Sequence, residues 1–360
     1  MPIPPLYGHE GTRNRLVGAI ASGRLPQALL LEGPQGVGKQ RLALWLAQAL
    51  VCEGEGRETG EGCGECRHCK FVLTLSHPDV HWFVPLELSK KGADADKQIE
   101  LVEEALAEEM AARRERPYYQ PPTGLASHGI ASVRLLLRRL ALRPALARRR
   151  VFIIGDAERL VPQAGTDAGA NALLKTLEEP PPDTVFVLTA AEPDALLPTI
   201  RSRVVRVRMA RLADSIVAAF AQRELGVSSQ RALAQRVGMA EGRIGRLLAE
   251  GGQAAGGAGE TGAAGVAAAE RFIAAVEGGA VRRHAFALAQ QPFQARGGFT
   301  AMLDGLLERL RAQARAGGET EKVVEAIAQV LEARGLAQGN VNPQLVAAVL
   351  AEDLAGGEPR

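Results

Sequence analysis

A glycine-rich turn that ends in a lysine is the first stretch of this sequence that could do chemistry. Residues 33–40 read GPQGVGKQ; an apolar run over 28–31 precedes them and predicts a short buried strand, and a helical pattern over 42–50 follows. A strand, a glycine-rich turn and a helix with a lysine at its start form a phosphate-binding P-loop. Glycine lets the backbone wrap closely around a phosphate, and the helix N-terminus offers free N–H groups. The plainer alternative is a turn that only joins strand to helix.

The residues of a nucleotide site can be named, and two positions depart from what such a site needs. Gln40 stands where a Ser or Thr hydroxyl normally binds Mg²⁺. Asp156 follows the apolar run 151–154 and could bind Mg²⁺, but Ala157 stands where a second, catalytic carboxylate is normally found. Glu158 comes one residue late and is expected to point elsewhere, and Asp156 could equally cap a turn. The candidate nucleotide-binding residues, in a degenerate site, are Gly33, Gly36, Gly38, Lys39, Gln40 and Asp156.

Four cysteines predict a metal centre. Cys52, Cys63, Cys66 and Cys69 are the only cysteines of the chain and follow the pattern C-x10-C-x2-C-x2-C. Four thiolates suit tetrahedral zinc and leave no position for water, so we expect a structural Zn²⁺ module over 52–69. The alternatives are disulfides or unrelated buried thiols. His68 is surplus to the ligand set, and we expect it to face solvent.

Strand and helix patterns alternate in the first part of the chain, which predicts a parallel sheet covered by helices on both faces. From about residue 211 the pattern is helical only. The apolar runs that predict strands lie at 28–31, 79–84, 151–154, 184–188 and 204–207. Arginines 201, 203, 206 and 208 alternate around the last of these runs, and taken alone they indicate a solvated strand face.

Composition limits the class of protein. The chain has 360 residues with 46% apolar residues, which is enough for two or three folded domains. Its formal net charge is +2 and only 4% of its residues are aromatic, so any contact with nucleic acid would be local or shared with partners. No apolar run approaches the ~20 residues of a membrane span, and no secretion signal opens the chain. We therefore expect a cytoplasmic protein with no membrane partner.

Together these segments resemble a known family. The P-loop and the segments 171–180 (NALLKTLEEP) and 184–189 (TVFVLT) are similar to those of AAA-plus ATPases. Segment 171–180, the motif His77-Pro78-Asp79, the four-cysteine module and Ser202-Arg203 before a strand resemble, more narrowly, the bacterial clamp-loader subunits of DNA polymerase III. The resemblance covers residues 1 to about 250, and the rest only in helical character.

The resemblance implies a division of the chain. It implies an AAA-plus α/β domain over 1–209 that contains the zinc module and a helical lid over 210–250. A Gly/Ala-rich linker over 251–265 and an all-α collar domain for oligomerisation over 266–360 follow. The implied partners are the clamp-loader gamma/tau and delta subunits and, through the complex, the sliding clamp and primer-template DNA.

Departures from the family pattern favour one branch. Gln40, Ala157 and Gly245 replace residues that the gamma/tau motor uses, and the pair at 190–191 lacks its polar sensor. These losses favour the delta-prime branch and disfavour ATP binding, ATPase and polymerase activity by the chain itself. The resemblance also implies that Arg203 is an arginine finger that acts in trans on a neighbouring motor's ATP. Two alternatives stay open: an active gamma/tau-type ATPase, and a zinc-containing nucleic-acid-binding protein with a relic P-loop.

Overall fold

The computed structural model describes residues 3–56, 60–87, 94–118, 126–160, 168–251, 259–290, 296–315, 320–338 and 342–356. They form two compact units, one made of most of residues 1–248 and the other of residues 249–360. In the described residues, none of the helices combines the length and the apolar character needed to cross a bilayer.

A five-stranded parallel sheet is the centre of the first unit, as the sequence predicts. The strand order is β2-β3-β4-β1-β5, so the sheet is built by crossovers rather than by hairpins. β3, β4 and β1 are buried along their whole length, which explains their continuous apolar sequences. The edge strand β5 alternates valine and arginine and is largely exposed. The strands are β1 (Ala28–Glu32), β2 (Val80–Phe83), β3 (Arg150–Ile154), β4 (Thr184–Ala190) and β5 (Val205–Arg208).

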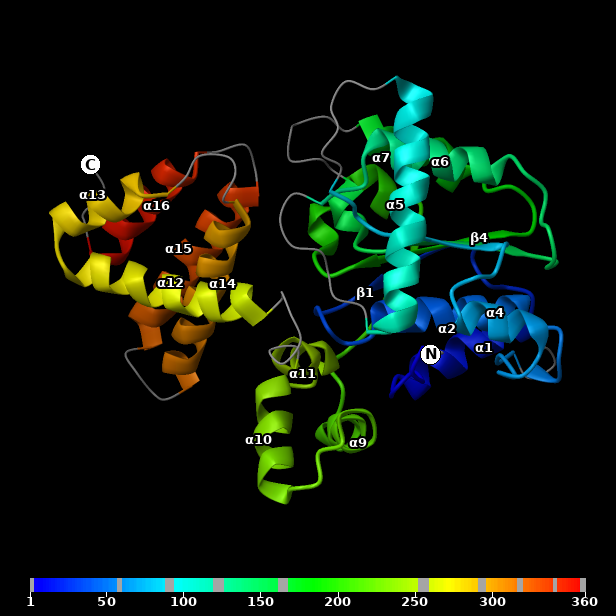
Figure 1. Cartoon of the computed structure of the whole chain (residues 1–360), viewed down its shortest axis with the longest axis horizontal. Coiled ribbons are helices and arrows are strands. Elements are labelled where there is room, and N and C mark those ends of the chain that lie inside the picture. The colour runs from blue at the N-terminus through cyan, green and yellow to red at the C-terminus, as the bar shows by residue number, and fades with distance from the viewer. Residues whose placement is uncertain are drawn as a thin grey trace. The chain divides into compact units, whose positions relative to one another are not determined.

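Helices cover the sheet. Helix α2 packs directly against β1, β3 and β4, while α5 packs against α6 and α6 against α7. In Figure 1, α1, α2 and α4 lie on one side of β1 and β4, and α6 and α7 lie on the other. These elements are α1 (Glu10–Ala21), α2 (Lys39–Val51), α4 (Arg67–Leu73), α5 (Ala95–Glu115), α6 (Ile130–Leu140), η1 (Ala157–Leu160), α7 (Ala168–Glu178), η2 (Pro193–Ala195) and α8 (Pro198–Arg201).

Three helices with a small core of their own complete the first unit. They are α9 (Asp214–Leu225), α10 (Gln230–Ala240) and α11 (Ile244–Gly251). Val217, Phe220 and Leu247 are buried between them. Glycine in a left-handed conformation ends α9 at Gly226, a typical C-terminal cap.

The second unit is entirely helical in its described residues. Phe272, Leu303 and Leu350 are among its most buried side chains. Residues 259–265, which the sequence analysis assigned to a linker, are instead the first turns of α12, and 252–258 lie outside the described residues. The physical reason is alanine, which favours helix even among glycines. The helices are α12 (Gly259–Glu277), α13 (Ala280–Leu288), α14 (Arg296–Arg315), α15 (Thr320–Gln338) and α16 (Pro343–Leu354).

Candidate functional site

The P-loop residues come together between β1 and α2. Gly36 and Gly38 have φ angles of 84° and 101°, a left-handed conformation that favours glycine. Lys39 begins α2, and its Nζ donates hydrogen bonds to the carbonyls of Gly33 at 2.8 Å and Pro34 at 3.0 Å. Burial lowers the pKa of Lys39, and the carboxylates of Asp156 and Glu158 oppose that shift. The lysine is therefore folded back onto its own loop.

Gln40 fills the place that a Mg²⁺-binding hydroxyl would need. Its Oε1 accepts a hydrogen bond from Nε1 of Trp82 at 3.0 Å, and its Nε2 lies 3.4 Å from Oδ1 of Asp156. The amide also lies over Gly155 so closely that a Cβ there would come within 2.5 Å of Nε2. The carboxylate expected to bind Mg²⁺ thus faces a neutral amide that is already held by a tryptophan.

Asp156 and Glu158 lie near each other, but the carboxylate of Glu158 is turned toward the residue that follows β4. Oε1 of Glu158 accepts a hydrogen bond from the backbone N–H of Ala191 at 2.9 Å, beyond the end of β4. Burial raises the pKa of Glu158, the charge of Asp156 raises it further, and Lys39 lowers it. The tight 3₁₀ turn η1 after Asp156 carries this carboxylate back toward the sheet.

The α9–α11 segment touches the P-loop through two glycines. The backbone N–H of Gly245 donates a hydrogen bond to the carbonyl of Gly36 at 2.9 Å. A Cβ on Gly245 would lie 2.6 Å from Cα of Gly36, a distance that real side chains essentially never show. Gly245, one of the positions that depart from the family pattern, is therefore a backbone contact in this chain.

An aromatic cluster also fixes α9, and sequence reasoning did not find it. The hydroxyls of Tyr7 and Tyr118 both donate to the carboxylate of Glu224, at 2.6 and 3.0 Å, and both rings meet Phe220 edge-on. Burial, followed by the Glu224 carboxylate, raises the pKa of Tyr7 to about 12 and raises that of Tyr118 as well. The sequence offered one indication of this cluster, which is that tyrosine is rare: the chain has only three.

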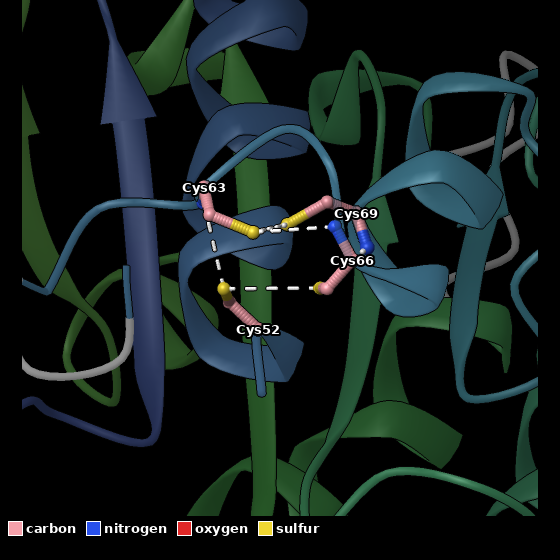
Figure 2. Close-up of side chains that lie close together, drawn as sticks. All are labelled: Cys52, Cys63, Cys66 and Cys69. Carbon is pink, nitrogen blue, oxygen red and sulfur yellow. Dashed lines mark hydrogen bonds between the residues drawn. The ribbon is translucent and has the colours of Figure 1, made fainter. Parts of the chain in front are cut away.

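The four cysteines converge, as Figure 2 shows. Cys52 follows α2, Cys66 caps α4, Cys69 lies in α4, and Cys63 lies in the loop between them. All four sulfurs lie within 4.8 Å of one another, with Cys52 3.9 Å from Cys66 and Cys63 3.8 Å from Cys69. Sulfurs about 2.3 Å from a tetrahedral zinc lie about 3.8 Å apart, so the cluster fits that ion. All four thiols are free, which disfavours the disulfide alternative.

Backbone N–H groups in this cluster stabilise the thiolate form of two of the cysteines. Sγ of Cys66 accepts from the N–H of Cys69 at 3.4 Å, and Sγ of Cys63 accepts from the N–H of Cys66 at 3.3 Å. Burial alone would raise the pKa of Cys66, but the N–H donors prevail and lower it to about 6. Donors also lower the pKa of Cys63, whereas burial raises that of Cys52 and Cys69. A cation would remove the remaining cost of charging the buried thiols.

His68 is buried, which corrects the expectation that it faces solvent; only 1% of its surface is exposed. Its Nδ1 lies 2.8 Å from Nε2 of His77, and its Nε2 lies 3.1 Å from a carboxylate oxygen of Glu53. Nδ1 of His77 accepts from the N–H of Asp79 at 3.0 Å. Nδ1 of His77 therefore carries no proton, and its Nε2–H donates to Nδ1 of His68. The cysteine module is thus attached to the start of β2.

The motif His77-Pro78-Asp79 owes its pattern to this packing. Asp79 is buried and accepts three backbone hydrogen bonds, from Ala145, Leu146 and Ala147, at 2.6, 2.8 and 2.7 Å. Burial opposes its charge, but these donors outweigh burial and lower the pKa of Asp79. The aspartate is a structural anchor for the loop before β3.

The four arginines of the last strand region are ion-paired. Arg203 donates to Thr199 O at 2.7 Å and to Ser202 Oγ at 3.3 Å, and it forms an ion pair with Glu178. Arg201 pairs with Asp194 at 2.6 Å. Arg206 and Arg208 both bind the buried Glu32 of β1, at 2.6 and 2.9 Å, and so lower its pKa against the effect of burial. The arginines of β5 thus lie on a largely exposed strand, as the sequence predicts, and they also neutralise a buried carboxylate of the neighbouring strand.

Comparisons with known proteins agree with the sequence resemblance. A family model described as "DNA polymerase III, delta subunit" matches residues 8–213. The DNA polymerase III subunit delta' of Yersinia pestis is 34% identical over 189 residues, covering 52% of this chain and 43% of that protein. The Escherichia coli delta' subunit is 30% identical over 235 residues, covering 65% and 57%. The gamma/tau subunit of Mycobacterium tuberculosis is 32% identical over 199 residues, covering 55% and 27%. The chain spans about half the length of the delta' relatives that it matches.

Proposed function

Because the chain belongs to the DNA polymerase III, delta subunit family, we propose that it is the delta-prime subunit of a clamp loader, and that it does not hydrolyse ATP itself. Such a subunit takes part in DNA replication by helping a heteromeric ring to place the sliding clamp on primer-template DNA. Its catalytic contribution is made in trans, at the ATP site of a neighbouring gamma/tau motor. We place it in the cytoplasm, where the reducing environment suits four free thiols.

One observation carries the non-hydrolysing part of this proposal: the amide of Gln40 lies between Trp82 and Asp156. A motor needs a hydroxyl and a carboxylate around Mg²⁺, and it needs a second carboxylate to orient water. In this chain an amide replaces the hydroxyl and occupies the carboxylate, and Ala157 lacks the second carboxylate. Glu158 does not replace it, because its Oε1 is bonded to the N–H of Ala191.

Arg203 is the residue that we propose as the finger. Arginine stabilises the charge that spreads over a transferring phosphoryl group, because its planar guanidinium stays protonated and offers several N–H donors. The side chain is 28% exposed, so it can be presented to a neighbouring chain. It follows the short helix α8, which supplies one of its hydrogen-bond acceptors through Thr199.

We propose the domain limits 1–209, 210–250 and 266–360 for the AAA-plus domain, the lid and the collar. Support for a collar comes from exposed apolar side chains of the second unit. Val281 and Leu288 of α13, and Leu345 and Val349 of α16, are all more than half exposed. Helices α13 and α16 pack against each other, and an apolar surface of this kind suits neighbouring subunits such as gamma/tau and delta.

The metal has a structural part in this proposal. Cys52, Cys63, Cys66 and Cys69 would hold one Zn²⁺, and four thiolates leave no open coordination position for a reactant. Zinc would then cross-link the end of α2 to α4. The pair His68 and His77 carries that attachment on to β2.

The test is ATP turnover, measured for the chain alone and for the loader reconstituted with its cognate motor and delta subunits. We expect no turnover by the chain alone, and a fall of roughly 10³- to 10⁵-fold in the assembly on Arg203→Ala, by analogy with other trans-acting arginines. Lys39→Ala should leave the assembly unchanged. Turnover by the chain alone that disappears with Lys39→Ala would instead establish a gamma/tau-type motor.

A further inference from the structure

Glu178 and Arg203 form an ion pair between two elements that are not adjacent in sequence. Glu178 is the last residue of α7, and Arg203 lies just after α8. Nη2 of Arg203 donates to Oε1 of Glu178, while Nη1 donates to Thr199 O and to Ser202 Oγ. The guanidinium is therefore held by a carboxylate from one element and by the backbone and hydroxyl of another.

This arrangement fixes an otherwise flexible side chain. A guanidinium has five N–H groups, and the acceptors named above take three of them. Nε is buried without a hydrogen-bond partner, so in the described structure the remaining N–H with access to a ligand belongs to Nη2. A free arginine side chain loses rotamer entropy when it engages a phosphate. A side chain that is already held loses less of that entropy at the moment of binding.

The other arginines of the run have different surroundings. Arg201 pairs with Asp194, whose side chain is 89% exposed, and this is the kind of surface pair that contributes little. Arg206 and Arg208 bind Glu32 within the sheet. Arg203 alone among the four is held by both α7 and the α8 segment while its side chain stays partly open to solvent.

We propose that Glu178 is a positioning residue for Arg203: it holds the guanidinium in the orientation in which its free edge meets the γ-phosphate of a neighbouring subunit's ATP. This inference rests on the finger role proposed above and adds a second residue to it. Glu178 does not touch the nucleotide. Its contribution is to orient the arginine before the phosphate arrives.

The test is steady-state ATP turnover by the reconstituted loader with saturating clamp and primer-template DNA, with kcat and KM measured separately. Glu178→Ala should lower kcat roughly 3- to 30-fold with KM unchanged, because orientation and not ground-state binding is lost. Glu178→Gln keeps the acceptor oxygen at the same reach and should retain most of kcat. Glu178→Asp keeps the charge but withdraws the oxygen, and it should resemble the alanine variant. Asp194→Asn, which disturbs the neighbouring Arg201 pair, is the matched control and should behave as wild type.

The double variant Glu178→Ala/Arg203→Ala decides whether the two residues act together. If Glu178 works through Arg203, the double variant should be no slower than Arg203→Ala alone. A normal or faster rate for Glu178→Ala beside a slow Arg203→Ala would overturn the positioning role and leave the finger intact. Additive losses would overturn it too, since Glu178 would then act elsewhere. An unaffected Arg203→Ala loader would refute the finger role, and the role of Glu178 with it. Glu178 is half exposed at a helix end, so its variants are expected to fold and assemble, which gel filtration checks.

Discussion

Gly36 of the P-loop and Gly245 of α11 meet backbone to backbone, with the N–H of Gly245 bonded to the carbonyl of Gly36 at 2.9 Å. The two glycines are far apart in sequence, and neither leaves room for a side chain at the contact. Together with the Tyr7 and Tyr118 hydroxyls on Glu224, this contact holds the α9–α11 segment against the P-loop. Such contacts favour a single fixed position of the α9–α11 segment relative to the P-loop.

Gly245→Ala should therefore destabilise the chain, although alanine usually favours a helix. The new Cβ would lie 2.6 Å from Cα of Gly36, so the segment must shift, at a cost of about 1–3 kcal/mol typical of overpacking. Urea unfolding measures the change. Gly238→Ala is the control, because α10 offers open space at that position, and it should be neutral or stabilising by about 0.5–1 kcal/mol. Equal stability of the two variants would show that the contact is loose.

Stability should fall as the pH drops from about 6.5 toward 4. Burial lowers the pKa of His128 from 6.5 to about 4, and Nε2 of this neutral ring donates to the carbonyl of Gly155 at 2.7 Å. Between pH 6.5 and 4 the imidazole is protonated in the unfolded chain but stays neutral in the folded chain. Its contribution to the free energy of unfolding is therefore complete above pH 6.5 and decreases as the pH falls toward 4. His77 and His81 act in the same direction.

His128→Gln isolates one of these groups. The glutamine keeps an N–H donor for Gly155 but cannot titrate in this range. The slope of the unfolding free energy against pH between 4 and 6.5 should become shallower by up to about 1.4 kcal/mol per pH unit. Denaturant titrations at several pH values measure the slope. An unchanged slope would mean that His128 takes up its proton over the same pH range in the folded and the unfolded chain.

Purified chain should contain one zinc ion, and Cys66→Ser should bind it much more weakly. Thiolate is the ligand that zinc prefers in such sites, and the four sulfurs are already at tetrahedral spacing. Serine is a good helix N-cap, so the variant retains the capping role that Cys66 has at α4, and any loss of stability reports on the metal. Elemental analysis and thermal melting with and without a chelator measure both effects. A melting temperature that the chelator does not change would argue against a structural role for the metal.

Asp79→Asn should destabilise the chain by about 3 kcal/mol or more. The buried carboxylate accepts three backbone hydrogen bonds. An asparagine amide has one acceptor oxygen, and its NH2 group would face backbone N–H groups that are themselves donors. Asp96→Asn, on the exposed first turn of α5, should change the unfolding free energy by less than about 0.5 kcal/mol. Similar losses in the two variants would contradict the anchoring role of Asp79.

The sequence by itself determined the P-loop, the parallel sheet and the cysteine cluster. Each is signalled by residue type and short spacing: continuous apolar runs for buried strands, glycines before a lysine for a phosphate turn, and thiols three residues apart for a metal. The departures at Gln40 and Ala157 were visible for the same reason, since each is a substitution within a local pattern.

Only the tertiary structure decided what those departures do. The Gln40 amide reaches Trp82 and Asp156, and His68 is buried by its contact with His77 and not left facing solvent. The carboxylate of Glu178 reaches Arg203, and Tyr7 finds Glu224 across 217 positions of sequence. Such contacts depend on how strands and helices pack, and no periodicity or motif encodes which distant side chain fills a given space.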